Sequence, residues 1–275
     1  MRAVPSPVVS IDRLTWRDNA ATPGARTIPE ETPIALTYGR TTHAVMMATP
    51  ADLTDFALGF SLSEGIVERP AEIEALDIVV VDDGIELRMD LVQKRQTGLA
   101  RRQRRITGPG GCGLCGMDSL AEALRPLPAV VSDVAFTAME IQAARASMPE
   151  AQRLNALTRA VHAAAFWTPG QGLVALREDV GRHNALDKLL GAMASSGHRA
   201  AEGIVLLSSR VSVEMVQKAA VLGAAVIVAV SAPTALAVRV AEAAGVTLIG
   251  IARTDAFEVF SHPDRIKTGS APHVA

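Results

Sequence analysis

The chain contains two cysteines, Cys112 and Cys115, in a Cys-x-x-Cys arrangement within a glycine-rich stretch. Five glycines and one proline lie between residues 106 and 117, which disfavours a continuous helix or strand and predicts a loop. A dense run of arginine and lysine residues between 94 and 105 leads into this loop. Cationic neighbours favour the thiolate, which is the form of cysteine that acts as nucleophile or metal ligand. The sequence therefore predicts chemistry at this loop first.

Three kinds of function remain open for such a thiol pair after a structural zinc site is excluded. Structural zinc needs four ligands, whereas this pair supplies two and no histidine pair stands at the required spacing, so no zinc is expected. A thiol–disulfide oxidoreductase is one alternative, although redox pairs usually begin a helix and the glycines disfavour that. A chaperone that only binds a cofactor is another. Transfer of sulfur, in which one thiolate accepts a sulfur atom and passes it on, suits a loop with this backbone freedom best.

A second polar cluster extends from Arg177 to Lys188, where a predicted strand meets a predicted helix. It contains more ionisable side chains than a helix cap requires, although a strand end, a glycine turn and an amphipathic helix would also explain them. His183 and Asp187 are four residues apart, so the carboxylate is expected to orient the imidazole. We expect a functional role for this cluster, but the residues do not specify which.

Polar residues also follow three predicted strands in the second half of the chain. They lie at Ser208 to Arg210, at Ser231 to Thr234, and at Arg253 to Asp255. Ligands of parallel sheets bind beyond the carboxyl ends of the strands, and the N–H groups that begin the following helices attract phosphate. The sequence therefore predicts a phosphate-bearing ligand at these strand ends, although it contains neither the dinucleotide fingerprint nor a P-loop.

The elements that must position these residues alternate regularly in the second half. Strands are predicted at 162–167, 173–176, 203–207, 225–230 and 246–251, and helices at 182–194, 211–222 and 233–243. Alternation of nearly continuous apolar strands with helices predicts an α/β fold, with a parallel sheet covered on both faces.

The first half is predicted to be a smaller α+β region. Strand pairs are expected at 34–38 with 43–48 and at 78–81 with 85–89, separated by a helix that Thr49 caps and that stops near Gly65. Capping-box patterns at Thr137 and Ser147 predict two consecutive helices. The expected boundaries are a tail at 1–30, the α+β region at 31–130, the α/β domain at 131–265 and a tail at 266–275.

Composition restricts the remaining possibilities. A formal net charge of −2 disfavours a nucleic-acid binder, and two cysteines in 275 residues form no disulfide framework, which indicates a reducing compartment. The N-terminus has no signal-peptide pattern. The uncharged stretch from Ala219 to Val238 is interrupted by glycine, serine and proline and is not expected to span a membrane. A cytoplasmic protein is expected.

Several of these motifs together resemble the formate dehydrogenase accessory sulfurtransferases, the FdhD family of sulfur carriers. The resemblance covers residues from about 31 to 263. It is carried by Cys112–Gly116, Phe56–Gly65, Glu178–Lys188, Ser208–Lys218 and Ser231–Thr234, which occur in the order typical of the family.

The resemblance implies a three-layer sandwich with a mixed or parallel sheet, similar to the cytidine deaminases, and a homodimer. It implies that sulfur comes as persulfide from a cysteine desulfurase and goes to the molybdenum bis-molybdopterin guanine dinucleotide cofactor of formate dehydrogenase. By motif position, Cys112 would carry the persulfide and Cys115 would be its partner. The implied cofactor segment is Ile251, Ala252, Arg253, Thr254, Asp255 and Ala256, which we expect to act with Ser208, Arg210, Ser231, Thr234 and His183.

Overall fold

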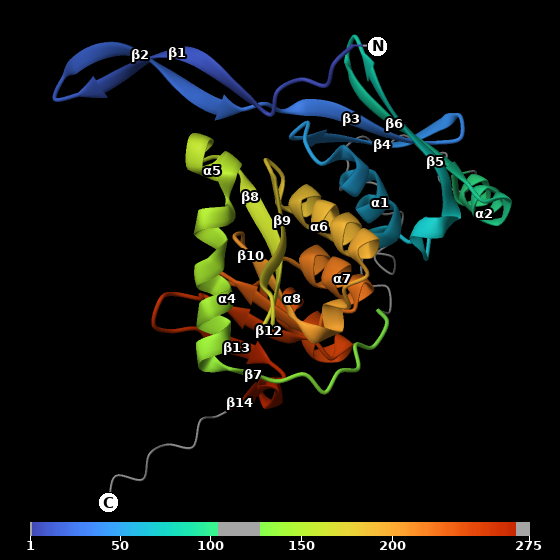
Figure 1. The fold of residues 1–275 in the computed structure, drawn as a ribbon, viewed down its shortest axis with the longest axis vertical. Coiled ribbons are helices and arrows are strands. Elements are labelled where there is room, and N and C mark those ends of the chain that lie inside the picture. The colour runs from blue at the N-terminus through green and yellow to red at the C-terminus, as the bar shows by residue number, and fades with distance from the viewer. Residues whose placement is uncertain (1, 104–126, 268–275) are drawn as a thin grey trace, which may run out of the picture.

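A six-stranded sheet forms the centre of the second half of the chain (Figure 1). The computed structural model describes residues 2–103 and 127–267. In spatial order the strands are β13 (Glu258–Ser261), β12 (Thr247–Gly250), β11 (Val226–Ala229), β10 (Ile204–Leu207), β8 (His162–Thr168) and β9 (Gly172–Asp179). The central three are parallel to one another, while β8 and β13 run antiparallel to their neighbours. The predicted α/β fold is confirmed, with a mixed sheet.

Helices cover both faces of this sheet. Helix α4 (Ala138–Ala151) packs on one face, and α6 (Arg182–Ser196), α7 (Val213–Leu222) and α8 (Ala235–Ala244) lie on the other (Figure 1). The last three each end at a glycine in the left-handed conformation, as is common at helix C-termini. Because β10, β11 and β12 are buried along their whole length, their apolar runs are continuous rather than alternating.

One of the two predicted capping boxes is confirmed and the other is wrong. The Thr137 side chain accepts a hydrogen bond from the Glu140 amide and begins α4. The Ser147 hydroxyl instead donates to the Ala144 carbonyl inside the same helix, which continues past Pro149. The second helix, α5 (Arg153–Thr158), begins later.

The first half forms a separate four-stranded sheet in the order β4-β3-β6-β5. The strands are β3 (Thr32–Tyr38), β4 (Thr41–Ala48), β5 (Ile73–Val81) and β6 (Gly84–Leu91), and the helices are α1 (Leu53–Ser63) and α2 (Gln93–Gln103). Both predicted strand pairs are confirmed. Phe56 and Phe60 of α1 are buried with the inner side chains of this sheet and form a core of their own. We call this unit the N-terminal module.

Helix α1 begins at Leu53, so the prediction that Thr49 caps it is wrong. Asp52, immediately before the helix, is left-handed and makes no side-chain cap. Thr49 is bound to the C-terminal half instead: its hydroxyl accepts from the Val180 amide, and its own amide donates to Asp179. The residues around Thr49 have the pattern of a helix cap, but its hydroxyl is hydrogen-bonded to the amide of Val180, which lies 131 residues away in the sequence.

Most of the segment 1–30, which was expected to be a tail or an edge segment, forms strands. Strands β1 (Val8–Arg17) and β2 (Ala20–Pro29) form an antiparallel hairpin that extends from the body (Figure 1). Asp18 and Asn19 make its turn, both with positive φ, as a tight two-residue hairpin turn requires. Most residues of both strands are exposed, so no apolar alternation marks them. We call this hairpin the arm.

Short elements complete the described chain. They are β7 (Phe136–Thr137), which pairs with β14 (Ile266–Lys267), and three turns of 3₁₀ helix at Pro70–Glu72, Ala200–Glu202 and Pro263–Arg265. The segment from Ala219 to Val238 contains the end of α7, strand β11 and the start of α8. None of the helices in residues 2–103 and 127–267 is both long and apolar enough to span a membrane.

Candidate functional site

Most of the polar cluster at 177–188 joins the N-terminal module to the C-terminal domain. Lys188 and Asp179 form an ion pair at 2.7 Å, and both side chains are 0% exposed. The Lys188 ammonium also donates to the Thr49 carbonyl at 2.9 Å. The Asn184 amide donates to Asp179 at 3.1 Å and to the Met47 carbonyl at 2.9 Å. These contacts bind the loop before α1 to the start of α6, which is a structural role.

Asp187 has a similar role, and the prediction that it orients His183 is wrong. Its carboxylate accepts hydrogen bonds from the Lys218 ammonium at 2.9 Å and from the Ser63 hydroxyl at 2.7 Å. Lys218 also donates to Glu64. Lys218 of α7 and Ser63 of α1 therefore hold the Asp187 carboxylate, because the buried ammonium of Lys218 attracts it more strongly than a neutral imidazole would.

Two glycines allow the helices that carry these pairs to cross closely. A Cβ atom on Gly59 of α1 would lie 1.7 Å from the Asp187 carbonyl oxygen. On the facing helix, a Cβ atom on Gly191 of α6 would lie 2.0 Å from the Asp55 carbonyl oxygen. Neither position has room for a side chain, so the two helix backbones are in contact there.

The residues of the cluster that are not used in this junction lie at the start of α6. Three buried polar atoms there have no hydrogen-bond partner: Arg182 Nε, His183 Nε2 and, at the start of α7, Ser212 Oγ. Buried polar atoms are nearly always paired, so such a group indicates a place where a ligand or water belongs. Neither α6 nor α7 has a side-chain cap, so both helix starts also offer backbone N–H groups.

His183 is neutral in this environment. Burial, followed by the charges of Arg182 and Lys218, lowers the pKa of His183 to about 4. Its Nε2 atom lies 3.9 Å from Glu214 Oε2, too far for a hydrogen bond. A neutral imidazole donates from one nitrogen and accepts at the other. Arg182 and the helix N–H groups add donors that suit an anion, while the Glu214 carboxylate 3.9 Å from the imidazole is the acidic group at this donor-lined surface.

The structure brings the three predicted strand ends together beside this cluster. Val211 donates to the Ala232 carbonyl and accepts from the Thr234 amide, which joins the first two strand ends. The Ile251 amide donates to the Ser231 carbonyl, which joins the second and third. All three follow parallel strands, and β9, which leads into α6, points the same way. We call this edge the carboxyl edge.

Several of the predicted side chains at this edge already have structural partners. Ser208 Oγ accepts from the Ala163 amide, and Thr234 Oγ1 caps α8 by accepting from the Ala237 amide. The Arg253 guanidinium donates to the Val230 carbonyl. Arg210 is exposed. Thus this part of the edge offers a ligand mainly backbone groups and the Arg210 cation.

Ile251 begins the segment after β12 in a strained conformation. Its φ is 51°, which is rare for a β-branched residue. Hydrogen bonds from the amides of Ile251 and Ala252 to the neighbouring segments hold it there. The chain then bends at residues 254 and 255, and the Arg253 amide donates to the Ala256 carbonyl across this bend. Strain that the surrounding structure maintains is common at ligand sites.

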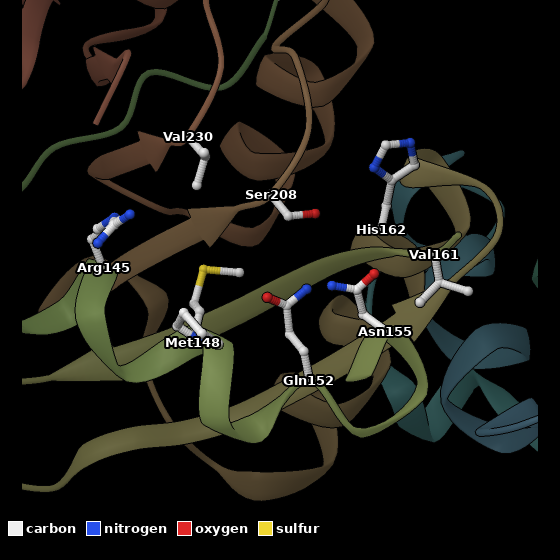
Figure 2. A pocket seen from close by; sticks show the side chains of 9 residues that line it. Arg145, Met148, Gln152, Asn155, Val161, His162, Ser208 and Val230 are labelled. Atoms are coloured by element: carbon white, nitrogen blue, oxygen red, sulfur yellow. The ribbon is translucent and has the colours of Figure 1, made fainter. Parts of the chain in front are cut away.

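A pocket of about 280 Å³ opens at the carboxyl edge on the face of the sheet that α4 covers (Figure 2). Its lining residues are Arg145, Met148, Pro149, Gln152, Asn155, Val161, His162, Ser208 and Val230. Burial, followed by the charge of Arg182, lowers the pKa of His162, which lines this pocket. Except for Ser208, sequence reasoning missed these residues, because α4, α5 and β8 each contribute only a few and no local motif joins them.

The remaining predictions concern thiols and metals. Cys112 and Cys115 lie outside the described residues. The basic run lies partly in α2, where Arg95 pairs with Glu68 at 2.6 Å and with Glu72 at 2.9 Å and is not available to a ligand. Within residues 2–103 and 127–267, no three potential metal ligands lie close enough together to hold an ion.

Comparison with known proteins gives consistent similarities. The model of the FdhD/NarQ family matches residues 29–267. A protein of Agrobacterium fabrum named sulfur carrier protein FdhD is 49% identical over 257 residues, covering 93% of this chain and 95% of that protein. A protein of the same name from Brucella abortus is 54% identical, covering 93% and 96%. A crystal structure named for a proposed formate dehydrogenase accessory protein of Desulfotalea psychrophila has a TM-score of 0.74 at 23% identity, covering 95% of this chain and 100% of that one. At that identity, the last similarity supports the fold.

Proposed function

Because the chain belongs to the FdhD/NarQ family, we propose that it is a sulfur carrier that serves formate dehydrogenase. Its donor is a cysteine desulfurase, and its acceptor is the molybdenum bis-molybdopterin guanine dinucleotide cofactor, which it binds as cargo. The observation that carries this proposal is a Cys-x-x-Cys pair in a chain about half identical to named sulfur carriers over nearly its whole length. The location is proposed to be cytoplasmic.

The transfer begins with thiol exchange. The Cys112 thiolate attacks the outer sulfur of the donor persulfide, forms a new sulfur–sulfur bond and releases the donor cysteine as thiolate. Cys112 then holds the persulfide, and attack of the Cys115 thiolate on its inner sulfur breaks the sulfur–sulfur bond, forms a Cys112–Cys115 disulfide and releases the terminal sulfur to the cofactor at the sulfide level. The glycines around both cysteines permit the approach to two different partners.

The carboxyl edge is the proposed binding site of the cofactor. Two uncapped helix starts, the unpaired Nε donor of Arg182 and the unpaired polar atoms of His183 and Ser212 suit the phosphate groups of a dinucleotide. The adjacent pocket of about 280 Å³ has the size to take one end of such a ligand. The segment from Ile251 to Ala256 lies at the same edge, as the family resemblance implies for a cofactor-binding segment.

Two finer points of the resemblance belong to the same proposal. The C-terminal domain is proposed to be related to the cytidine deaminases, which the alternation of strands and helices around its mixed sheet favours. The protein is proposed to act as a homodimer.

After incubation with a cysteine desulfurase and cysteine, we expect the intact protein to gain about 32 Da, the mass of one sulfur atom, in a form that reductant removes. The adduct should map to the peptide that contains Cys112, because that thiol is proposed to attack the donor. Cys112→Ala should lose the adduct, while Cys115→Ala, the matched control, should keep it.

The alternatives give different results in this experiment. An adduct that survives Cys112→Ala and disappears in Cys115→Ala would reverse the assignment of the two thiols. A mass loss of about 2 Da without an adduct would indicate a disulfide and favour the oxidoreductase. Unchanged support of formate dehydrogenase by the double Cys→Ala variant would favour the chaperone.

A second prediction concerns the carboxyl edge. Calorimetry with GDP should show saturable binding that weakens as salt is added, because screening reduces the attraction of phosphate. Arg182→Ala should weaken this binding about tenfold or more, the usual effect of losing a charged hydrogen bond. The control is Arg199→Ala, since Arg199 is 77% exposed and precedes β10 at the opposite edge of the sheet.

Two results would remove the cofactor from this edge. One is equal weakening by both arginine variants, which would reflect general charge rather than a site. The other is the absence of GDP binding at low salt by the unmodified protein.

A further inference from the structure

A buried carboxylate holds the short helix that forms part of the pocket wall. Glu178, the last residue but one of β9, is 6% exposed. Its Oε2 atom accepts from the Leu154 amide and its Oε1 atom from the Asn155 amide, both at 2.8 Å. Hydrogen bonds from helix-start amides to an ionised carboxylate are among the stronger ones in proteins. Asp179, the next residue, pairs with Lys188 of α6 instead, because consecutive side chains of a strand point to opposite faces.

Helix α5 has few other contacts that fix its position. A helix of six residues is too short to be stable alone. Its side chains bury little apolar surface, since Leu157 is 61% exposed and the one buried residue is Thr158. Its last turn receives one long hydrogen bond, at 3.4 Å, from Arg26 of the arm to the Thr158 carbonyl. Gln152, at the cap position, makes no side-chain cap, so Glu178 takes the place of a cap on two of the four amides that a helix start leaves free.

The first turn of α5 carries an amide side chain into the pocket. Asn155 lines the cavity of about 280 Å³, together with Gln152 immediately before the helix (Figure 2). In the part of the chain that the structure describes, the side-chain amide of Asn155 has no hydrogen-bond partner. An amide group offers both donors and an acceptor, so Asn155 is equipped to bind a polar part of a ligand.

We infer that Glu178 is a positioning residue of this pocket: it fixes the first turn of α5, so that the Asn155 side chain faces the ligand. Glu178 is not one of the residues that line the pocket, so it acts through α5 and not by contact with the ligand. Hydrogen bonds weaken steeply with distance and angle, so a small shift of α5 is sufficient to weaken binding. The inference rests on the proposed function, in which the pocket takes one end of the guanine dinucleotide cofactor.

Glu178→Gln tests the inference at nearly constant side-chain volume. The glutamine oxygen can accept from one of the two backbone amides, but its own N–H group faces the other. GDP binding, measured by calorimetry, should weaken about tenfold, as expected when one hydrogen bond to the ligand is lost. Asn155→Ala should weaken it by a similar factor. The double variant should be about as weak as Asn155→Ala alone, because both changes remove the same contact. Fully additive effects would overturn the inference.

Thr137→Ala is the matched control. Thr137 caps the far end of α4, on the same face of the sheet, where its hydroxyl accepts from the Glu140 amide at 3.2 Å. This variant should lower the free energy of unfolding, as the loss of a helix cap does, and leave GDP binding by the folded protein unchanged. Equal weakening of GDP binding by Thr137→Ala and Glu178→Gln would overturn the inference, because Glu178 would then act only through overall stability.

Two measurements without a ligand separate this inference from the proposed function. Hydrogen exchange at the Leu154 and Asn155 amides should become at least about tenfold faster in Glu178→Gln, while exchange in α4 stays the same. Burial lowers the pKa of His162, which lines the same pocket, so its NMR titration in Glu178→Gln should move up toward the ordinary value as α5 shifts. Loss of the Glu178 charge alone would lower this pKa, so a rise reports the movement of α5.

The two sets of results can fail separately. Unchanged exchange and an unchanged or lowered pKa of His162 would overturn the inference, whether or not GDP binds. If the unmodified protein binds no GDP, the proposed cofactor site fails, while faster exchange and a raised pKa of His162 would still support the role of Glu178 in holding α5 at the pocket.

Discussion

Lys188→Met is expected to lower the free energy of unfolding by about 3–5 kcal/mol, enough to unfold much of a marginally stable chain. Lys188 is 0% exposed, and its ammonium is shared between the Asp179 carboxylate at 2.7 Å and the Thr49 carbonyl at 2.9 Å. Methionine fills a similar volume, so the loss comes chiefly from the buried carboxylate that is left without its cation. Urea denaturation followed by circular dichroism measures it.

Two further variants identify the cause. In Asp179→Asn/Lys188→Met both charges are absent, so part of the stability should return. Arg199→Met breaks an exposed pair with Glu202 at 3.1 Å and should change the free energy of unfolding by less than about 1 kcal/mol. If Lys188→Met were as mild as Arg199→Met, the buried pair would not be what holds the junction together.

The second large effect is expected from Gly59→Ala, which should destabilise the protein by about 1–3 kcal/mol or more. Helix propensity alone predicts the opposite sign, since alanine in the middle of a helix is about 1 kcal/mol more favourable than glycine. The added methyl group, however, would lie 1.7 Å from the Asp187 carbonyl oxygen, and backbone on both sides prevents a small adjustment. Thermal denaturation should therefore show a lower midpoint.

Gly98→Ala provides the matched control for this substitution. Gly98 lies inside α2, and a Cβ atom there has nothing within 4 Å. The same chemical change should therefore leave stability unchanged or slightly raise it. A Gly59→Ala protein as stable as the Gly98→Ala protein would show that α1 and α6 can separate without cost.

The sequence predicts those parts of the fold whose residues face one consistent environment. Strands β10, β11 and β12 are buried on both faces, so their apolar runs identified them, and the helices between them followed from their own spacing. The arm was missed because both of its faces meet water, which removes the alternation. Asp18-Asn19 was the available signal, since these residues tolerate the positive φ of a two-residue turn.

The candidate site could be predicted where topology determines it and not where distant contacts do. Parallel strands bring their carboxyl ends to one edge, so Ser208, Ser231 and Ile251 were expected near one another. Thr49 and Asp187 were misassigned, because each has a local pattern with an ordinary meaning but a partner in another part of the chain. The pocket was largely missed, since its lining residues share no spacing along the chain.

The junction between α1 and α6 has a consequence for how the polypeptide can be divided. Its ion pairs and its glycine contacts are all made by side chains and backbone of residues 47–64 and 177–218, and none of these contacts uses the covalent connection through residues 104–126. The two halves therefore have the recognition surface of a complementing fragment pair. Each half produced alone would expose charged side chains that are buried in the whole protein. It would also expose the helix face that carries Gly59 in one half or Gly191 in the other. Together, as separate polypeptides, they carry everything that this junction needs to reassemble.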